Sequence, residues 1–107
     1  HDSAENAENA LEDLLKAGDW HAMVAALDVR PDLGDLRYGS IAAVLGAAMD
    51  GDPDRMHKLL ERVYRMIDAV DRRLVESLLE RAILPGDCPE GFEDLREWFR
   101  RTEGRGD

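Results

Sequence analysis

The chain has 107 residues, 44% of them hydrophobic and 36% charged, and its formal net charge is −10 at pH 7. This size suits one domain over residues 1–107 with a single core, and we expect only residues 1–2 and 103–107 to be disordered. So acidic a surface repels nucleic-acid phosphates, and the single cysteine, Cys88, leaves no internal disulfide framework and no thiolate zinc site.

Two helices are predicted on either side of a Gly18-Asp19 turn, because glycine suits a left-handed helix end and aspartate caps the helix that follows. The first helix has an apolar face of Ala4, Ala7, Leu11, Leu14 and Leu15. Its separate acidic stripe consists of Glu5, Glu8 and Glu12. The short second helix carries Trp20, Met23, Val24 and Leu27. Residues 30–35 are predicted to be a loop, since Pro31 and Gly34 interrupt the helical pattern.

A third helix, from roughly Leu36 to Met49, is the expected centre of the core, because it has almost no charge after Ser40. Gly39 and Gly46 weaken this helix, and we expect them where neighbouring helices pass closely. Asp52 followed by Pro53 predicts the N-cap and the first residue of a fourth helix. The buried face of that helix would hold Met56, Leu59, Leu60, Val63 and Ile67.

Asp71 is the expected N-cap of a fifth helix, which Pro85 and Gly86 would end. The apolar positions of this helix are Leu74, Val75, Leu78 and Leu79. A sixth helix after Pro89 would carry Phe92, Leu95, Trp98 and Phe99. No segment alternates with a period of two. The predicted fold class is therefore all-α, with five or six helices in antiparallel hairpins.

Gly-Asp pairs recur at 18–19, 51–52 and 86–87, separated by 33 and 35 residues. A period near 33 residues is typical of stacked helical hairpins. The string from Ala47 to Leu60 resembles the turn between the helices of an ankyrin repeat, and the Gly-Asp-Trp corner at 18–20 is similar to a tetratricopeptide repeat. This resemblance implies a short α-solenoid-like stack that binds protein through a concave face. The alternative is an irregular helical bundle with repeated turn chemistry.

No recognisable catalytic or metal site emerges from the reactive side chains. His21 and His57 have no metal-ligand partner at His-x-x-x-His or Glu-x-x-His spacing. Cys88 stands at a helix start, before Pro89, with no convincing base nearby in sequence. Asp50, Asp52, Asp54 and Glu61 match four positions of a calcium loop, but Arg55 stands where that loop requires glycine. We therefore predict no enzyme activity, no catalytic residue, no metal and no cofactor.

The composition favours a non-catalytic protein that binds a basic protein partner in the cytoplasm. Residues 1–28 alone contain seven acids and one base, a net charge of −6. The predicted contact residues are Glu5, Glu8, Glu12, Trp20, Trp98 and Phe99. The most concrete form is a small inhibitor of the immunity or antitoxin type. Twelve arginines against two lysines hint at a bacterial source.

Two other functions fit the same composition. A secretion or assembly chaperone would show an apolar groove near Leu27, Leu45 and Leu60. A nucleic-acid-mimicking regulator would present residues 2–13 as a row of carboxylates. The basic residues Arg62, Arg65, Arg72 and Arg73 would pair with the acidic first helix in the same molecule or in a second copy, so a homodimer is also permitted. No membrane contact is expected, because the longest run without a charged or strongly polar residue, residues 41–49, is too short for a span.

Overall fold

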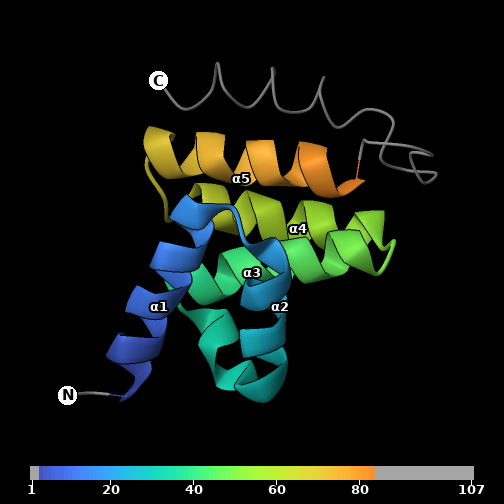
Figure 1. Ribbon diagram of the computed structural model, residues 1–107. Helices are drawn as coiled ribbons and strands as arrows, with labels where there is room; N and C mark the ends of the chain where they lie inside the picture. The colour runs from blue at the N-terminus through green and yellow to red at the C-terminus, as the bar shows by residue number, and fades with distance from the viewer. Residues whose placement is uncertain (1–2, 84–107) are drawn as a thin grey trace.

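The computed structural model describes residues 3–83, which form five α-helices and one 3-10 helix and contain no strand (Figure 1). The helices are α1 Ser3–Ala17, α2 Trp20–Val29, the 3-10 helix η1 Pro31–Asp35, α3 Arg37–Met49, α4 Pro53–Tyr64 and α5 Ala69–Ile83. The predicted all-α fold class is confirmed. The predicted sixth helix lies outside the described residues, and so do Cys88, Trp98 and Phe99.

Two turns of the same design join α1 to α2 and α3 to α4. Gly18 and Gly51 both adopt left-handed backbone, with φ of 78° and 70°. In each turn the glycine N–H donates to the carbonyl three residues back (3.1 Å in both), and the aspartate N–H donates to the carbonyl five residues back (3.0 Å in both). The side chains of Asp19 and Asp52 then accept the N–H three residues ahead, at 3.1 and 3.2 Å. The predicted chemistry of these two Gly-Asp turns is confirmed.

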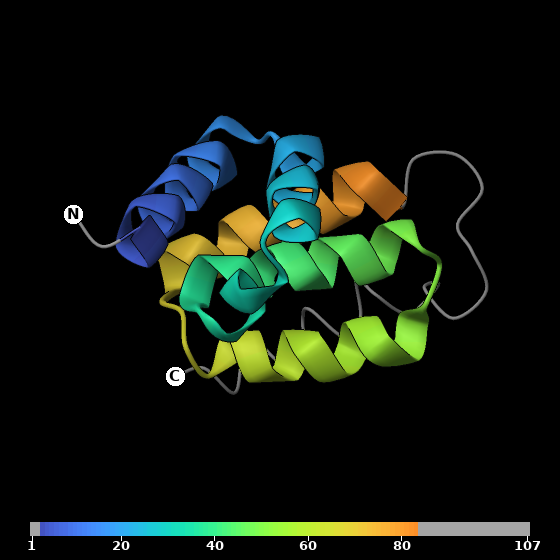
Figure 2. The ribbon, with the colours of Figure 1, turned by 90° about the horizontal axis from the view of Figure 1, so that it is seen from below.

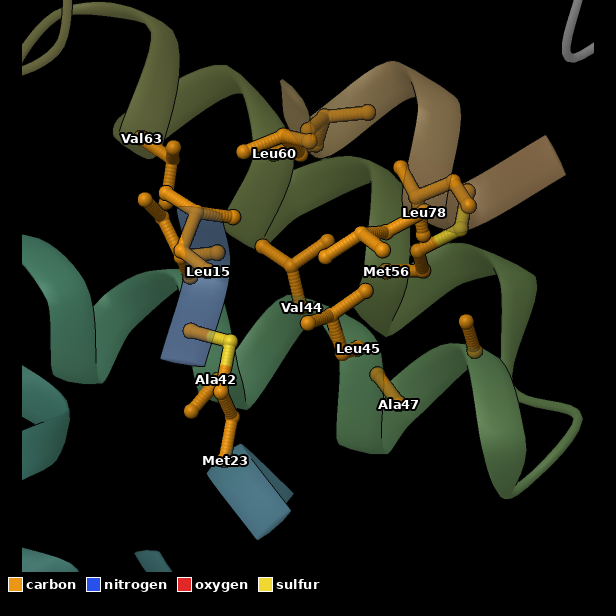
Figure 3. Close-up of a cluster of buried hydrophobic side chains, with 14 of the residues drawn as sticks. Leu15, Met23, Ala42, Val44, Leu45, Ala47, Met56, Leu60, Val63 and Leu78 are labelled. Carbon is orange, nitrogen blue, oxygen red and sulfur yellow. The ribbon is translucent and has the colours of Figure 1, made fainter. Parts of the chain in front are cut away.

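Helix α3 is the centre of the described fold, and all the other described helices pack against it (Figures 1 and 2). Its side chains Ile41, Val44 and Leu45 are fully buried. Figure 3 shows side chains from α1, α2, α4 and α5 converging on α3, among them Leu15, Met23, Leu60 and Leu78. The prediction that this helix forms the buried centre is therefore confirmed.

The segment predicted as a loop is a 3-10 helix that lies tightly on α3. A Cβ added at Gly39 would stand 1.7 Å from the carbonyl oxygen of Leu33, so only glycine fits there. Ser40 Oγ donates a hydrogen bond to the Gly34 carbonyl (2.8 Å), and the guanidinium of Arg62 reaches the same oxygen (3.0 Å). Pro31 therefore follows the end of α2 as expected, whereas Gly34 lies inside η1, which these contacts hold against α3 and α4.

The N-cap of α5 differs from the prediction. The Asp68 side chain, and not that of Asp71, accepts the N–H at the start of the helix, at 2.9 Å from the Asp71 nitrogen. Asp71 itself is buried and accepts a hydrogen bond from the Tyr38 hydroxyl (2.9 Å), which joins α5 to α3. None of the helices within residues 3–83 combines the length and the apolar character needed to cross a membrane.

Candidate protein-binding groove

The three glutamates of the predicted acidic stripe of α1, Glu5, Glu8 and Glu12, have different surroundings in the structure. Glu8 accepts the backbone N–H groups of Tyr38 (3.1 and 3.2 Å) and Gly39 (3.2 Å). These N–H groups lie in the first turn of α3, where the helix itself supplies no acceptor for them. The N-cap residue Leu36 makes no side-chain capping bond. Glu12 lies 3.1 Å from the Lys16 ammonium, and its hydrogen bond to Lys16 lowers the pKa of this carboxyl. Glu5 is exposed.

Trp20, the predicted aromatic anchor within the described residues, is half-buried against the core at the start of α2. The Arg81 guanidinium lies 5.9 Å from the centre of the indole ring, and the His21 ring centre lies 4.9 Å from it. The contact with Arg81 joins α2 to the last turn of α5. Trp20 therefore contributes to packing between helices in this structure.

A groove runs along the outer surface of α3, between α2 and the first turn of α4. It consists of two adjoining hollows of about 300 and 380 Å³ that share Leu27, Asp28, Ala43 and Arg55 in their lining. We call it the acidic groove and define it by the floor residues Leu27, Ala43, Gly46 and Ala47 and the rim residues Asp28, Asp35, Asp50 and Arg55. Figure 2 shows α3 between α2 and α4.

The rim of the acidic groove carries a net negative charge. Asp28, Asp35, Asp50 and Arg55 are all exposed, and three carboxylates against one guanidinium leave a local charge of −2. Arg62 lies 3.5 Å from Asp35, but this carboxylate is 93% exposed, so solvent screens the pair strongly. The groove therefore combines an apolar floor of small side chains with carboxylates that a cation can approach.

A separate hollow of about 300 Å³, the apolar cleft, lies between α1, α2 and η1. Its lining residues are Ala7, Ala10, Leu11, Leu14, Ala26, Val29, Arg30 and Leu33. Val29 at its edge is 81% exposed. The groove that a chaperone would need was expected near Leu27, Leu45 and Leu60. Of these, Leu27 lines the acidic groove, whereas Leu45 and Leu60 are completely buried in the core.

Two of the arginines expected to face an acidic first helix make other contacts. Arg62 of α4 donates to the Gly34 carbonyl of η1, and the Arg72 guanidinium lies 4.6 Å from the centre of the Tyr64 ring. Arg65 and Arg73 are exposed. Arg62 thus links α4 to η1, and Arg72 links α5 to α4.

One of the four acids that match a calcium loop, Asp52, acts as the N-cap of α4. Asp52 accepts the Arg55 N–H, as capping requires. Among residues 3–83, no three His, Cys, Asp or Glu side chains come together in a way that could hold a metal ion.

Reasoning from sequence missed the acidic groove, because its rim residues come from four separate elements. Asp28 belongs to α2, Asp35 to η1, Arg55 to α4, and Asp50 follows α3. The one available signal was the run of small residues in α3, which was interpreted only as core. Comparisons of the chain with protein-family models, curated proteins and solved structures give no match.

Proposed function

We propose that this chain is a non-catalytic protein-interaction module that holds a basic segment of a protein partner in the acidic groove. Its most concrete form is a small bacterial inhibitor of the immunity type, acting in the cytoplasm on a basic effector. The observation that supports this proposal is the combination of an apolar floor with three exposed carboxylates, Asp28, Asp35 and Asp50, around two adjoining hollows.

The charges and the floor have different roles in this proposal. An overall charge of −10 attracts a basic partner over a distance and raises the association rate, an effect that salt screens. Each exposed ion pair at the rim contributes only about 0.2–1 kcal/mol. Most of the affinity must therefore come from apolar contact with the floor, where Leu27 and Ala43 are half-buried.

The scaffold around the groove is suited to binding without rearrangement. The opposite face of α3, the floor helix, is buried in the core, and the Asp52 cap fixes the start of α4. A preformed site loses little conformational entropy when the partner arrives. This favours an inhibitor that binds fast and holds its partner in one geometry.

The apolar cleft supports a second candidate function, a secretion or assembly chaperone that shields a hydrophobic segment. Its lining is almost entirely apolar, with the exposed Val29 at the edge. A nucleic-acid mimic has less support, because Glu8 and Glu12 of the proposed row make contacts within the chain. Binding that persists at high salt would favour the chaperone over the inhibitor.

Affinity capture from a bacterial lysate tests the proposed function, at about 50 and about 500 mM NaCl. The test variant combines Asp28→Asn, Asp35→Asn and Asp50→Asn. A matched control neutralises three exposed acids outside the groove, Glu5→Gln, Asp13→Asn and Glu61→Gln.

We expect one basic partner that the wild type and the control retain at low salt, and that the groove variant loses. Equal loss with the control variant would show that overall charge, and not the groove, holds the partner. An unchanged capture with the groove variant would contradict the proposal directly.

A further inference from the structure

Gly46 lies inside α3, four residues before its C-cap Asp50, although nothing within the described chain requires a glycine there. Its φ is not in the left-handed region, and an added Cβ would lie 3.8 Å from a Val24 methyl, which is ordinary contact. Gly39 of the same helix differs, because its Cβ would collide with the Leu33 carbonyl at 1.7 Å. A glycine in a helix interior destabilises the helix relative to alanine. Gly46 therefore reduces helix stability without a gain in internal packing.

Gly46 lies on the floor of the acidic groove, beside Ala43 and Ala47. Because it has no side chain, the backbone of α3 is accessible there to another chain. A close approach of two backbones is one of the uses to which glycine is suited. The missing methyl group is thus explained if the partner contacts α3 at this position.

We propose that the occupant of the acidic groove is an α-helix of the basic protein partner, which crosses α3 at Gly46 through a small residue of its own. This inference rests on the proposed function, since it specifies the form of the segment that the groove holds. The partner helix carries basic side chains toward Asp28, Asp35 and Asp50.

Backbone hydrogen bonding favours a helix over an extended peptide. The floor and the longer walls are helices whose backbone groups are largely bonded within each helix, so they offer no sheet edge for strand pairing. An extended segment would place unpaired N–H and C=O groups over the apolar floor. A helix bonds its own backbone and presents only side chains to Leu27, Ala43 and Gly46.

The carboxylates also indicate the length of the partner helix. Asp35 precedes α3 and Asp50 follows it, and the 13 residues of α3 span about 20 Å. A helix of similar length would place basic residues in its first and last turns near these two carboxylates. Asp28 on α2 would meet a third basic residue between them, and Arg55 on the opposite wall would meet an acidic or neutral one.

Two synthetic peptides test this inference with the full-length chain. The first is a helical peptide of about 18 residues with lysines in its end turns and a leucine face that carries one alanine, placed about four residues from the lysines of one end. The second has the same charges but a central proline, which breaks the helix. Binding is measured by fluorescence anisotropy at about 100 mM NaCl for the wild type, Gly46→Ala and the groove variant with three Asp→Asn changes.

We expect the helical peptide to bind more tightly than the proline peptide by about tenfold or more. Gly46→Ala should raise Tm and weaken binding of the helical peptide about tenfold, because the methyl group enters a close contact. Ser77→Ala, an exposed helix-stabilising change on α5, should raise Tm without weakening binding. Ala43→Leu, which fills the same floor, should weaken binding as Gly46→Ala does.

Equal binding of the two peptides would overturn the helical occupant, and an undiminished affinity of both Gly46→Ala and Ala43→Leu would overturn the crossing at Gly46. In either case, weaker binding by the groove variant would still support the proposed function. If the groove variant binds the helical peptide as tightly as the wild type, the proposed function itself fails.

Discussion

The cap that Glu8 provides for α3 links a residue of the first helix to the stability of the whole fold. Its carboxylate accepts two backbone N–H groups, from Tyr38 and Gly39, at 3.1–3.2 Å. No side chain at the N-cap position itself, Leu36, makes a capping hydrogen bond. Replacing Glu8 by alanine would leave these N–H groups without their acceptor and remove a negative charge from the positive end of the helix dipole.

The expected loss for Glu8→Ala is about 2 kcal/mol. Removing an N-cap side chain costs about 0.5–2 kcal/mol, and hydrogen bonds to a charged group contribute about 1.5–3 kcal/mol. Glu8 is half-buried, so water can replace it only in part. For a domain of this size, this loss corresponds to a fall in Tm of roughly 8–16 °C.

Urea unfolding followed by far-UV circular dichroism measures this loss. Glu5→Ala, an exposed change on the same helix, should alter the free energy of unfolding by less than about 0.5 kcal/mol. The capping argument is refuted if Glu8→Ala also loses less than about 0.5 kcal/mol, or if Glu5→Ala loses as much as Glu8→Ala.

Three further predictions concern stability. Gly39→Ala should lower the free energy of unfolding by more than about 3 kcal/mol in urea, because its Cβ would displace η1; an unchanged midpoint would contradict this close packing. Asp52→Ala should lose about 1 kcal/mol by removing the cap of α4, whereas Asp54→Ala in the same turn should lose clearly less; equal losses would argue against the cap. Burial, and then the hydrogen bond to Asp71, raises the pKa of Tyr38 well above its usual range, so the folded chain keeps this proton to higher pH than the unfolded chain does. The free energy of unfolding should therefore fall as the pH rises above about 10, and the fall should be smaller in Tyr38→Phe; equal slopes in the two proteins would contradict this.

Features determined by neighbouring residues were predictable from the sequence. The Gly18 and Gly51 turns need only a residue that tolerates positive φ, followed by an aspartate that caps the next helix. The absence of charge from residues 41–49 placed α3 in the core. Both signals lie within a few residues of the structure they determine, which is why they could be recognised without knowing the packing.

Features determined by residues distant in sequence were not predictable. The spacing of Glu8 showed which face of α1 it shares with Glu5 and Glu12, but not that the start of α3, 30 residues away, lies against it. The acidic groove likewise exists only because α2 and α4 flank α3 in space. Asp71 was expected to cap α5 because of its position near the start of that helix, yet packing against Tyr38 buries it and leaves the cap to Asp68.

The most direct test of the acidic groove is an NMR titration of the isotope-labelled chain with the lysine-ended helical peptide. The proposed function predicts that the largest changes in amide chemical shift occur at groove residues, among them Leu27, Ala43 and Gly46, and that the groove variant abolishes them. Changes concentrated on α1 or α5, with the groove amides unaffected, would contradict it.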